Sequence, residues 1–165
     1  MSNPTRFPSV GWFRRLAHRM AAQTEKYKKL GVLDLTLVPR LRFANAQVEV
    51  YSITFKNYGC TAVETVPDAY TLSGAHSVII DGEYPYWREM IENIQRHGHA
   101  DLQHTLNYLT LPDWPLLLSA VDEEQGQLDI DRFYRYADSL QEFFNEAAAI
   151  ETSFAEEATC ASATG

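Results

Sequence analysis

The sequence lacks long apolar runs. A helix that crosses a bilayer needs about 18 consecutive apolar residues, and no stretch of the 165 residues reaches that length. The N-terminus also lacks the apolar block of a secretory signal, so we expect a cytoplasmic protein. Cysteine is scarce as well. Cys60 and Cys160 make neither a disulfide framework nor a zinc site with four thiolates, and both are expected to be free thiols.

Basic charge is scarce beyond residue 42. Up to that point the chain has nine Lys and Arg against two acids, a net charge of +7, whereas the remainder has five against twenty acids, a net charge of −15. The formal charge of the whole chain is −8. Because nucleic-acid binding depends on neutralising phosphates, this balance predicts no nucleic-acid partner, although a local basic surface near the N-terminus is compatible with it.

Sequence motifs of common catalytic sites are missing. The glycine-rich phosphate loop with its lysine does not occur, and no serine lies in the G-x-S-x-G context of a nucleophile elbow. Acidic side chains such as Asp81, Glu83 and Asp113 are available, but exposed acids are the rule in any protein. We therefore predict no catalytic residues and no enzymatic activity.

One group of potential metal ligands lies close together in the sequence, in the stretch HGHADLQH. Its members are His97, His99, Asp101 and His104. The H-x-H-x-D spacing resembles the first metal motif of the metallo-β-lactamase fold, but Leu102 stands where that motif has its next histidine, and no histidine follows His104. We predict no metal and no cofactor. A small enzyme that uses this cluster on a hydrophobic substrate is kept as an alternative.

The most continuous pattern is an apolar stripe in residues 129–154. Its members recur at steps of three and four residues: Phe133, Tyr136, Leu140, Phe143, Phe144, Ala147, Ile150 and Phe154. That spacing predicts an α-helix with one apolar face and one polar face. A face this rich in aromatic rings needs a surface to cover, and the upstream chain supplies strands rather than matching helices.

Two further amphipathic helices are predicted. The first covers residues 10–30, with Ser9 as its N-cap and Gly31 as its stop. Its polar side is basic: Arg14, Arg15, His18 and Arg19. This face fits either peripheral contact with an anionic membrane or an ordinary packed helix with a solvated side. The second helix covers residues 83–97 and ends at Gly98.

Elsewhere the apolar periodicity shortens to two, which predicts strands. The predicted strands are 33–37, 40–43, 48–55, 61–66, 70–74, 76–80 and a buried final strand at 116–121. Pro39 is expected to interrupt the first two, and residues 101–111 fit either a short helix or extended chain. The result is an α+β fold, in which an N-terminal, a central and a C-terminal amphipathic helix cover an antiparallel sheet. We expect a single domain, 1–154, and a flexible tail, 155–165.

Seven large apolar side chains from three segments are predicted to face this sheet. They are Trp87, Met90, Trp114, Phe133, Leu140, Phe143 and Phe144. Two interpretations remain open. The side chains form a filled core, or they line an apolar pocket of the size that holds a lipid tail.

The order of elements resembles the sterol carrier protein type two family. The phrase PSVGWF, which contains Ser9 to Phe13, introduces the first helix as an S-x-E-W-F phrase does in that family, and YPYWREMIENI supplies its Trp-containing helix after the meander. DAYTLSGAHSVI and GQLDIDRF are approximate counterparts of two further family phrases. The resemblance covers residues 8–149, and the tract 99–120 has no clear counterpart.

This resemblance implies a mixed α+β fold that binds sterols, fatty acids or acyl-CoA esters without chemistry, in a tunnel between sheet and helices. The expected function is therefore to bind such a hydrophobic molecule in an apolar pocket under the C-terminal helix, and to carry it or present it to a partner enzyme. The seven side chains named above would contact the ligand. A non-catalytic subunit that binds another protein is the remaining alternative.

Overall fold

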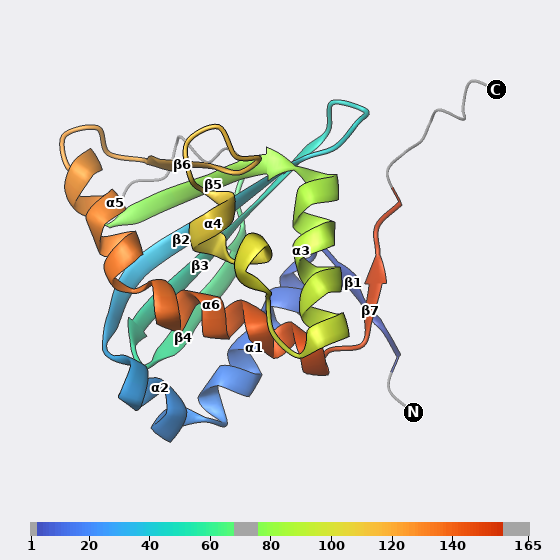
Figure 1. The fold of residues 1–165 in the computed structure, drawn as a ribbon, viewed down its shortest axis with the longest axis horizontal. Coiled ribbons are helices and arrows are strands. Elements are labelled where there is room, and N and C mark those ends of the chain that lie inside the picture. Colours follow the sequence, from blue (N-terminus) through green and yellow to red (C-terminus); the bar gives the residue numbers. More distant parts are fainter. Residues whose placement is uncertain (1–2, 68–75, 157–165) are drawn as a thin grey trace.

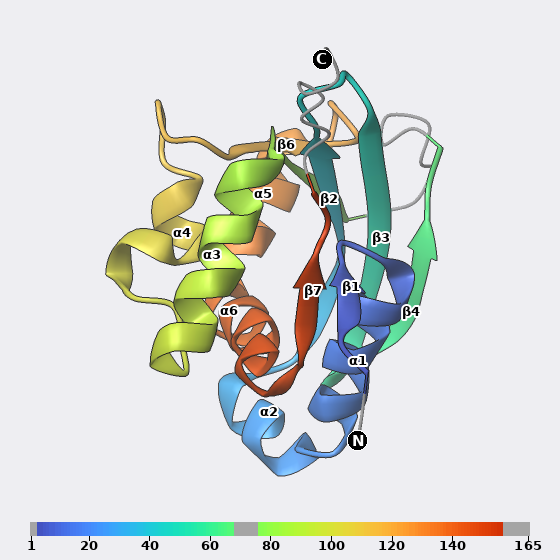
Figure 2. The ribbon, with the colours of Figure 1, turned by 90° about the vertical axis from the view of Figure 1, so that its right-hand side faces the viewer.

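A computed structural model describes residues 3–67 and 76–156 of the chain. Its centre is a five-stranded sheet in the order β4-β3-β2-β5-β6, and the helices cover one face of it (Figures 1 and 2). The strands are β2 (Leu33–Arg42), β3 (Val48–Asn57), β4 (Gly59–Thr65), β5 (Ser77–Glu83) and β6 (Leu117–Ala120). The predicted α+β class is confirmed.

The sheet is mixed, not purely antiparallel as predicted. β2, β3 and β4 form the expected antiparallel meander. β5 then pairs with the other edge of β2 in parallel, from Ser77 opposite Thr36 to Glu83 opposite Arg42. Parallel strands cannot be joined by a tight hairpin, so the turn signals that predicted the meander do not reveal this pairing. The strand predicted at 70–74 lies outside the described residues.

Pro39 does not interrupt β2. The strand runs through it, and Pro39 lies opposite Ile80 of the parallel partner. On the antiparallel side, the paired residues step from Leu37 to Arg40 and leave the positions between them unpaired. Proline lacks an N–H group, so it is tolerated in a central strand where no ladder hydrogen bond is required of it.

The predicted first helix is divided in two, α1 (Val10–Ala21) and α2 (Thr24–Leu30). Its N-cap is confirmed, because the Ser9 hydroxyl accepts a hydrogen bond from Trp12 N at 3.0 Å. The break falls at Gln23, whose φ of −126° and ψ of 40° are not helical. The Gln23 amide donates to a Glu146 carboxylate oxygen at 2.8 Å, a contact from the distant C-terminal region that no local pattern announces.

The central helix α3 (Tyr84–His97) agrees with the predicted one. Gly98 ends it with a φ of +84°, a left-handed conformation that glycine adopts without strain. The undecided tract forms a 3-10 turn, η2 (Leu102–His104), and the short helix α4 (Leu106–Leu109). The predicted buried strand is the edge strand β6, in which Leu117 is 63% exposed.

The predicted last helix is also divided. It forms α5 (Gly126–Arg135), α6 (Ala137–Asn145), the 3-10 turn η3 (Glu146–Ala149) and strand β7 (Thr152–Phe154). β7 pairs in parallel with β1 (Thr5–Phe7), so Phe154 lies in a strand and not on the helix. Ala155 is buried and its N–H donates to Phe7 O at 2.9 Å, while 157–165 of the predicted tail lie outside the described residues. Every helix in the described ranges is too short or too polar to cross a bilayer.

A buried carboxylate joins the two ends of the chain. Glu146 in η3 accepts hydrogen bonds from four groups of α1, α2 and the turn between them: Arg19 Nε at 3.0 Å, Gln23 Nε2 at 2.8 Å, Lys26 Nζ at 2.9 Å and Tyr27 OH at 2.8 Å. Burial alone would raise the pKa of Glu146, but these hydrogen bonds outweigh it and hold the pKa below its ordinary value of 4.5. The same burial, with the adjacent carboxylate, raises the pKa of Tyr27.

Glu146→Gln should destabilise the fold by about 2–4 kcal/mol at neutral pH, because it leaves buried donors without their charged acceptor. A group whose folded-state pKa is depressed contributes stability above its unfolded pKa and loses it as pH falls through the folded pKa. The difference between native and variant protein should therefore shrink as the pH falls below about 4.5.

Urea unfolding between pH 7 and pH 3 measures this difference. Glu142→Gln is the control, because Glu142 is partly exposed and contacts Lys26 at 3.5 Å, and its loss should cost less than about 1 kcal/mol. A Glu146→Gln effect that is small, or that does not change with pH, would contradict the assigned role.

Candidate functional site

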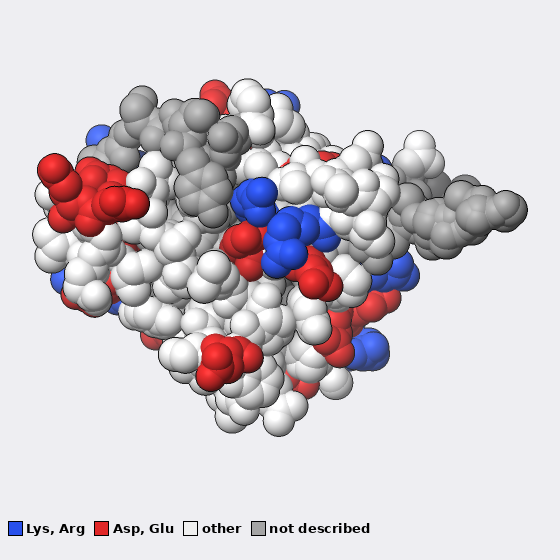
Figure 3. Space-filling model, turned by 90° about the horizontal axis from the view of Figure 1, so that it is seen from above, with Lys and Arg blue, Asp and Glu red and all other residues white. Residues whose placement is uncertain are grey.

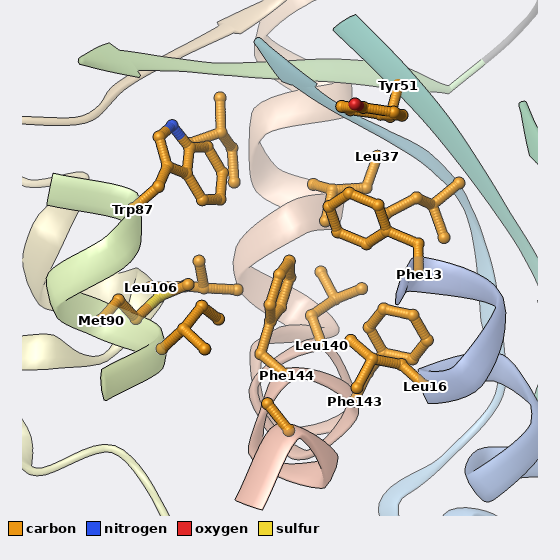
Figure 4. Packing of buried hydrophobic residues seen from close by; sticks show 14 of the residues in the cluster. Phe13, Leu16, Leu37, Tyr51, Trp87, Met90, Leu106, Leu140, Phe143 and Phe144 are labelled. Atoms are coloured by element: carbon orange, nitrogen blue, oxygen red, sulfur yellow. The ribbon is translucent and has the colours of Figure 1, made fainter. Parts of the chain in front are cut away.

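Six of the seven predicted ligand-contacting side chains lie together in the core. Trp87 and Met90 come from α3, Phe133 from α5, and three from α6: Leu140, Phe143 and Phe144. All six are 0% exposed. Figure 4 shows how those of α3 and α6 point toward one another and toward Phe13 of α1. The Phe144 ring lies 6.3 Å from Trp87 and 6.4 Å from Phe13, measured between ring centroids. In this structure side chains fill the space between sheet and helices.

Trp114, the seventh side chain, lies apart from this cluster. It is 43% exposed, in the loop between α4 and β6. Its ring packs edge-on against Tyr108 of α4, with 4.5 Å between centroids. The structure therefore places Trp114 at the surface beside α4 and not on the wall of the core.

A surface hollow of about 310 Å³ lies between α4 and α6, and we call it the α4–α6 groove. Most of its exposed lining surface is apolar, although four of the eight lining residues are polar or charged: Leu102, Thr105, Asn107, Tyr108, Leu111, Ala137, Asp138 and Gln141. Leu102 is 74% exposed and Leu111 41% exposed. Large aliphatic side chains left in water beside a concave surface are typical of binding sites. In Figure 1 the ribbon of α4 lies above that of α6.

Buried leucines separate the α4–α6 groove from the core. Leu106 and Leu109 of α4, with Leu116 of the following loop, are no more than 5% exposed and belong to the same apolar cluster as Trp87 and Phe144. The groove is therefore the outer side of a thin layer whose inner side is core. The sequence left this tract undecided, because leucines at 102, 106 and 109 follow a helical spacing for only two turns before Pro112 and Pro115.

A second hollow of about 400 Å³ lies between α1 and β4 and is more polar. Arg14, His18, Cys60 and Glu64 are among its lining residues. Burial raises the pKa of the Cys60 thiol to about 11, outweighing a hydrogen bond with the backbone of Ala62 that lowers it. A thiol of that pKa is protonated at neutral pH and is a poor nucleophile.

The predicted basic face of the first helix is partly occupied by contacts within the chain. Arg19 binds Glu146, and Arg14 donates to Val63 O at 3.3 Å. On another face, seen from above in Figure 3, basic and acidic side chains lie next to one another. Arg40 and Arg42 similarly share the carboxylate of Asp81, at 3.2 and 3.0 Å. Membrane contact through the basic helix stays a prediction.

The histidine cluster is only partly brought together. His104 Nδ1 lies 2.7 Å from Asp101 Oδ1, while His97 and His99 are exposed. Hydrogen bonds from His104 and from Asn93 lower the pKa of Asp101 to about 2. The Asp101 carboxylate caps η2, which is a structural role. Within residues 3–67 and 76–156, no group of three or more His, Cys, Asp or Glu side chains could hold a metal ion.

No protein-family model matches the sequence, and no curated protein matches it. Solved structures do match the fold. Over 86% of this chain and 97% of the other, the structure superposes on a crystal structure of sterol carrier protein 2 with a TM-score of 0.60 and 15% identity. The chain has the sterol carrier protein 2 fold. A conserved hypothetical protein of Thermus thermophilus, described as a candidate sterol carrier protein, matches over 89% of this chain and 93% of its own, with a TM-score of 0.58 and 14% identity.

The likeness to sterol carrier protein 2 confirms the fold that the sequence resemblance implied. At this level of identity it does not extend to residues or ligands. The α4–α6 groove and the six-residue cluster under α6 are therefore judged on their own contacts.

Phe144→Ala and Trp114→Ala should differ in their effect on stability. Phe144 is fully buried among rings, and its truncation should cost about 3–5 kcal/mol. Trp114 is half-exposed with one ring partner, so its truncation should cost about 1–2 kcal/mol. Urea unfolding of the two variants provides the comparison. Equal losses would mean that Trp114 is packed into the core or that Phe144 is not.

Proposed function

We propose that the chain is a non-catalytic carrier that binds a hydrophobic small molecule, of the sterol, fatty acid or acyl-CoA type, and presents it to a partner enzyme. The observation that carries this proposal is the apolar α4–α6 groove, which lies over the apolar core of a sterol carrier protein 2 fold. The printed names of the two similar structures concern sterol carriers. They support the class of ligand and leave its identity to experiment.

The chemistry of the groove suits an apolar body with few polar atoms. Apolar area removed from water contributes roughly 25 cal/mol per Å² before the costs of ordering are subtracted. Polar groups of the lining, such as those of Asn107 and Asp138, fix orientation more than they add affinity. The side chains of Thr105 and Gln141 are hydrogen-bonded within the protein. A carrier has to release its ligand again. A site that selects by size and apolar surface, without many polar contacts, allows that release.

The α4–α6 groove alone is too small for a sterol or a long acyl chain. About 310 Å³ lies at the lower limit of small-molecule sites, which range over about 300–1,000 Å³. A sterol or a long acyl chain therefore needs space from the neighbouring core. In this proposal the predicted contact residues Trp87, Met90, Phe133, Leu140, Phe143 and Phe144 form the inner wall of the enlarged site, and Trp114 lies at its rim.

The described side chains are also compatible with a protein that carries out no reaction. Cys60 is held protonated by burial. His104 is paired with Asp101 in a capping arrangement near the surface. Neither group has the activated nucleophile and base geometry that covalent catalysis requires.

Uptake of dehydroergosterol, a fluorescent sterol, tests the groove. Leu102→Arg combined with Leu111→Arg places two charges on its apolar rim and should weaken binding at least about tenfold, because burying an unpaired charge is costly. Both positions are exposed, so the fold should be retained.

Leu128→Arg is the matched control. Leu128 is 62% exposed on α5 and is not among the residues that line the groove. Fluorescence titration of the three proteins gives the affinities, and native mass spectrometry of freshly purified protein reports any lipid or protein that co-purifies. A protein partner without bound lipid, or sterol binding that is unchanged in the double variant, would count against the proposal.

A further inference from the structure

The indole N–H of Trp87 is a buried donor without an acceptor. Trp87 is 0% exposed, and its Nε1 atom has no hydrogen-bond partner. The other buried tryptophan is satisfied, since Trp12 Nε1 donates to Thr152 Oγ1 at 2.9 Å. Buried N–H groups are rarely left unpaired, so an orphaned one in an apolar site calls for a reason.

The unpaired indole N–H lies beside Gly82 of β5, which has no side chain. A Cβ atom placed on Gly82 would stand 3.4 Å from Trp87 Nε1, and only 2.3 Å from Leu116 Cδ2. In Figure 4 the indole nitrogen is on the side of the ring that faces away from Phe144. Glycine inside a strand often marks a place where another group approaches the backbone closely. Here the Leu116 side chain occupies that place. The Pro115 carbonyl oxygen lies 3.4 Å from the same point, but it makes no hydrogen bond with the indole.

The segment that carries Leu116 has few hydrogen bonds to the rest of the protein. Within residues 105–116, the described hydrogen bonds to the rest of the protein are those of Leu106 N with Gln141 Oε1, at 2.7 Å, and of Thr110 Oγ1 with Tyr134 OH, at 3.5 Å. The others stay inside the segment or join it to the turn just before it, and the 3.0 Å bond from Leu116 N to Leu109 O is one of these internal bonds. The burial of Leu106, Leu109 and Leu116 is therefore what mainly holds the segment. A ligand that replaces these apolar contacts can release it, because few hydrogen bonds to the rest of the protein have to break.

We propose that residues 105–116 are a movable plug, and that a ligand which displaces Leu116 receives a hydrogen bond from the Trp87 indole N–H. This inference rests on the proposed carrier function and narrows its ligand class. An indole N–H carries no charge and does not compensate a buried carboxylate. The ligand is therefore an apolar molecule with a neutral oxygen, such as an alcohol, sterol or ester, and not an ionised fatty acid.

Indole NMR signals test the hydrogen bond directly in the native protein. The chain has three tryptophans, so a ¹⁵N-labelled sample gives three indole signals, assigned with Trp→Phe variants. 1-Dodecanol should move the Trp87 indole proton downfield and leave that of Trp12 in place. Dodecane should bind without this shift, and laurate at neutral pH should bind more weakly than the alcohol.

Trp87→Phe keeps an aromatic ring and removes the donor. Dodecanol should bind this variant about fivefold to tenfold more weakly, the loss of one hydrogen bond, while dodecane is unaffected. If the alcohol and the alkane bind the native protein equally and the Trp87 signal does not move, the donor role is wrong and the carrier function stands. If neither compound nor dehydroergosterol binds, the carrier function itself fails. The NMR measurement does not depend on whether Trp87→Phe folds.

Leu116→Ala tests the plug. Removing the side chain that occupies the site should raise the affinity for dodecanol at least about tenfold, because less packing must be displaced. Leu33→Ala is the control, since Leu33 is equally buried, at 1% exposed, but lies at the start of β2. That variant should lose stability without any gain in affinity.

Hydrogen exchange measured by mass spectrometry follows the plug itself. Dodecanol should speed amide exchange in residues 105–116, because the segment leaves its seat when the ligand enters. Slower exchange there on binding would show that the ligand sits in the outer α4–α6 groove over a closed segment. That result, or equal affinities of Leu116→Ala and native protein, would overturn the plug.

Discussion

The inner face of the five-stranded sheet needs an apolar cover, and that need places the main helices that the structure describes. Leu35, Leu37 and Leu41 of β2 project to this face along with residues of β3 and β5. Strands buried on one side cannot leave such a row in water, because the hydrophobic effect is the largest favourable contribution to folding. The cover comes from three parts of the chain: α1 and α2 from the beginning, α3 from the middle, and α5 and α6 from the end. Glu146 then joins the first and the last of these parts at one point.

Local signals in the sequence predicted the elements that depend on local physics. The Ser9 cap, the Gly98 stop and the strand at β3 follow from hydrogen-bond capping, glycine geometry and β-branched composition. The breaks at Gln23 and Tyr136 were not predictable in this way. Gln23 leaves the helix where it contacts a carboxylate more than a hundred residues away, and Tyr136 lies inside an uninterrupted apolar period. The parallel pairing of β5 was missed for the same reason, since strand direction depends on the whole connection and not on the strand.

The residues of the candidate site also differ in whether local sequence patterns could predict them. Apolar periodicity found the six side chains of the core cluster, because burial is what periodicity records. It assigned Trp114 to the same wall, and the structure places it at the surface against Tyr108. The groove residues were missed because exposure of Leu102 and Leu111 is a property of the folded surface. A few leucines close the core on one side. In the proposed mechanism Leu116 and a bound ligand compete for the same space, because both would pack against the same apolar side chains.

The short parallel pair of β1 and β7 has a mechanical consequence. The chain enters β1 at Thr5, next to Thr152, and leaves β7 at Phe154, next to Phe7, so it enters and leaves this pair at opposite ends (Figure 1). Tension applied between the termini therefore loads this pair in shear. In this geometry its hydrogen bonds share the load and do not break one after another. The helices and the sheet behind the pair are shielded from the load until it yields. The β1–β7 pair is therefore the first part of the fold to bear a force applied between the termini.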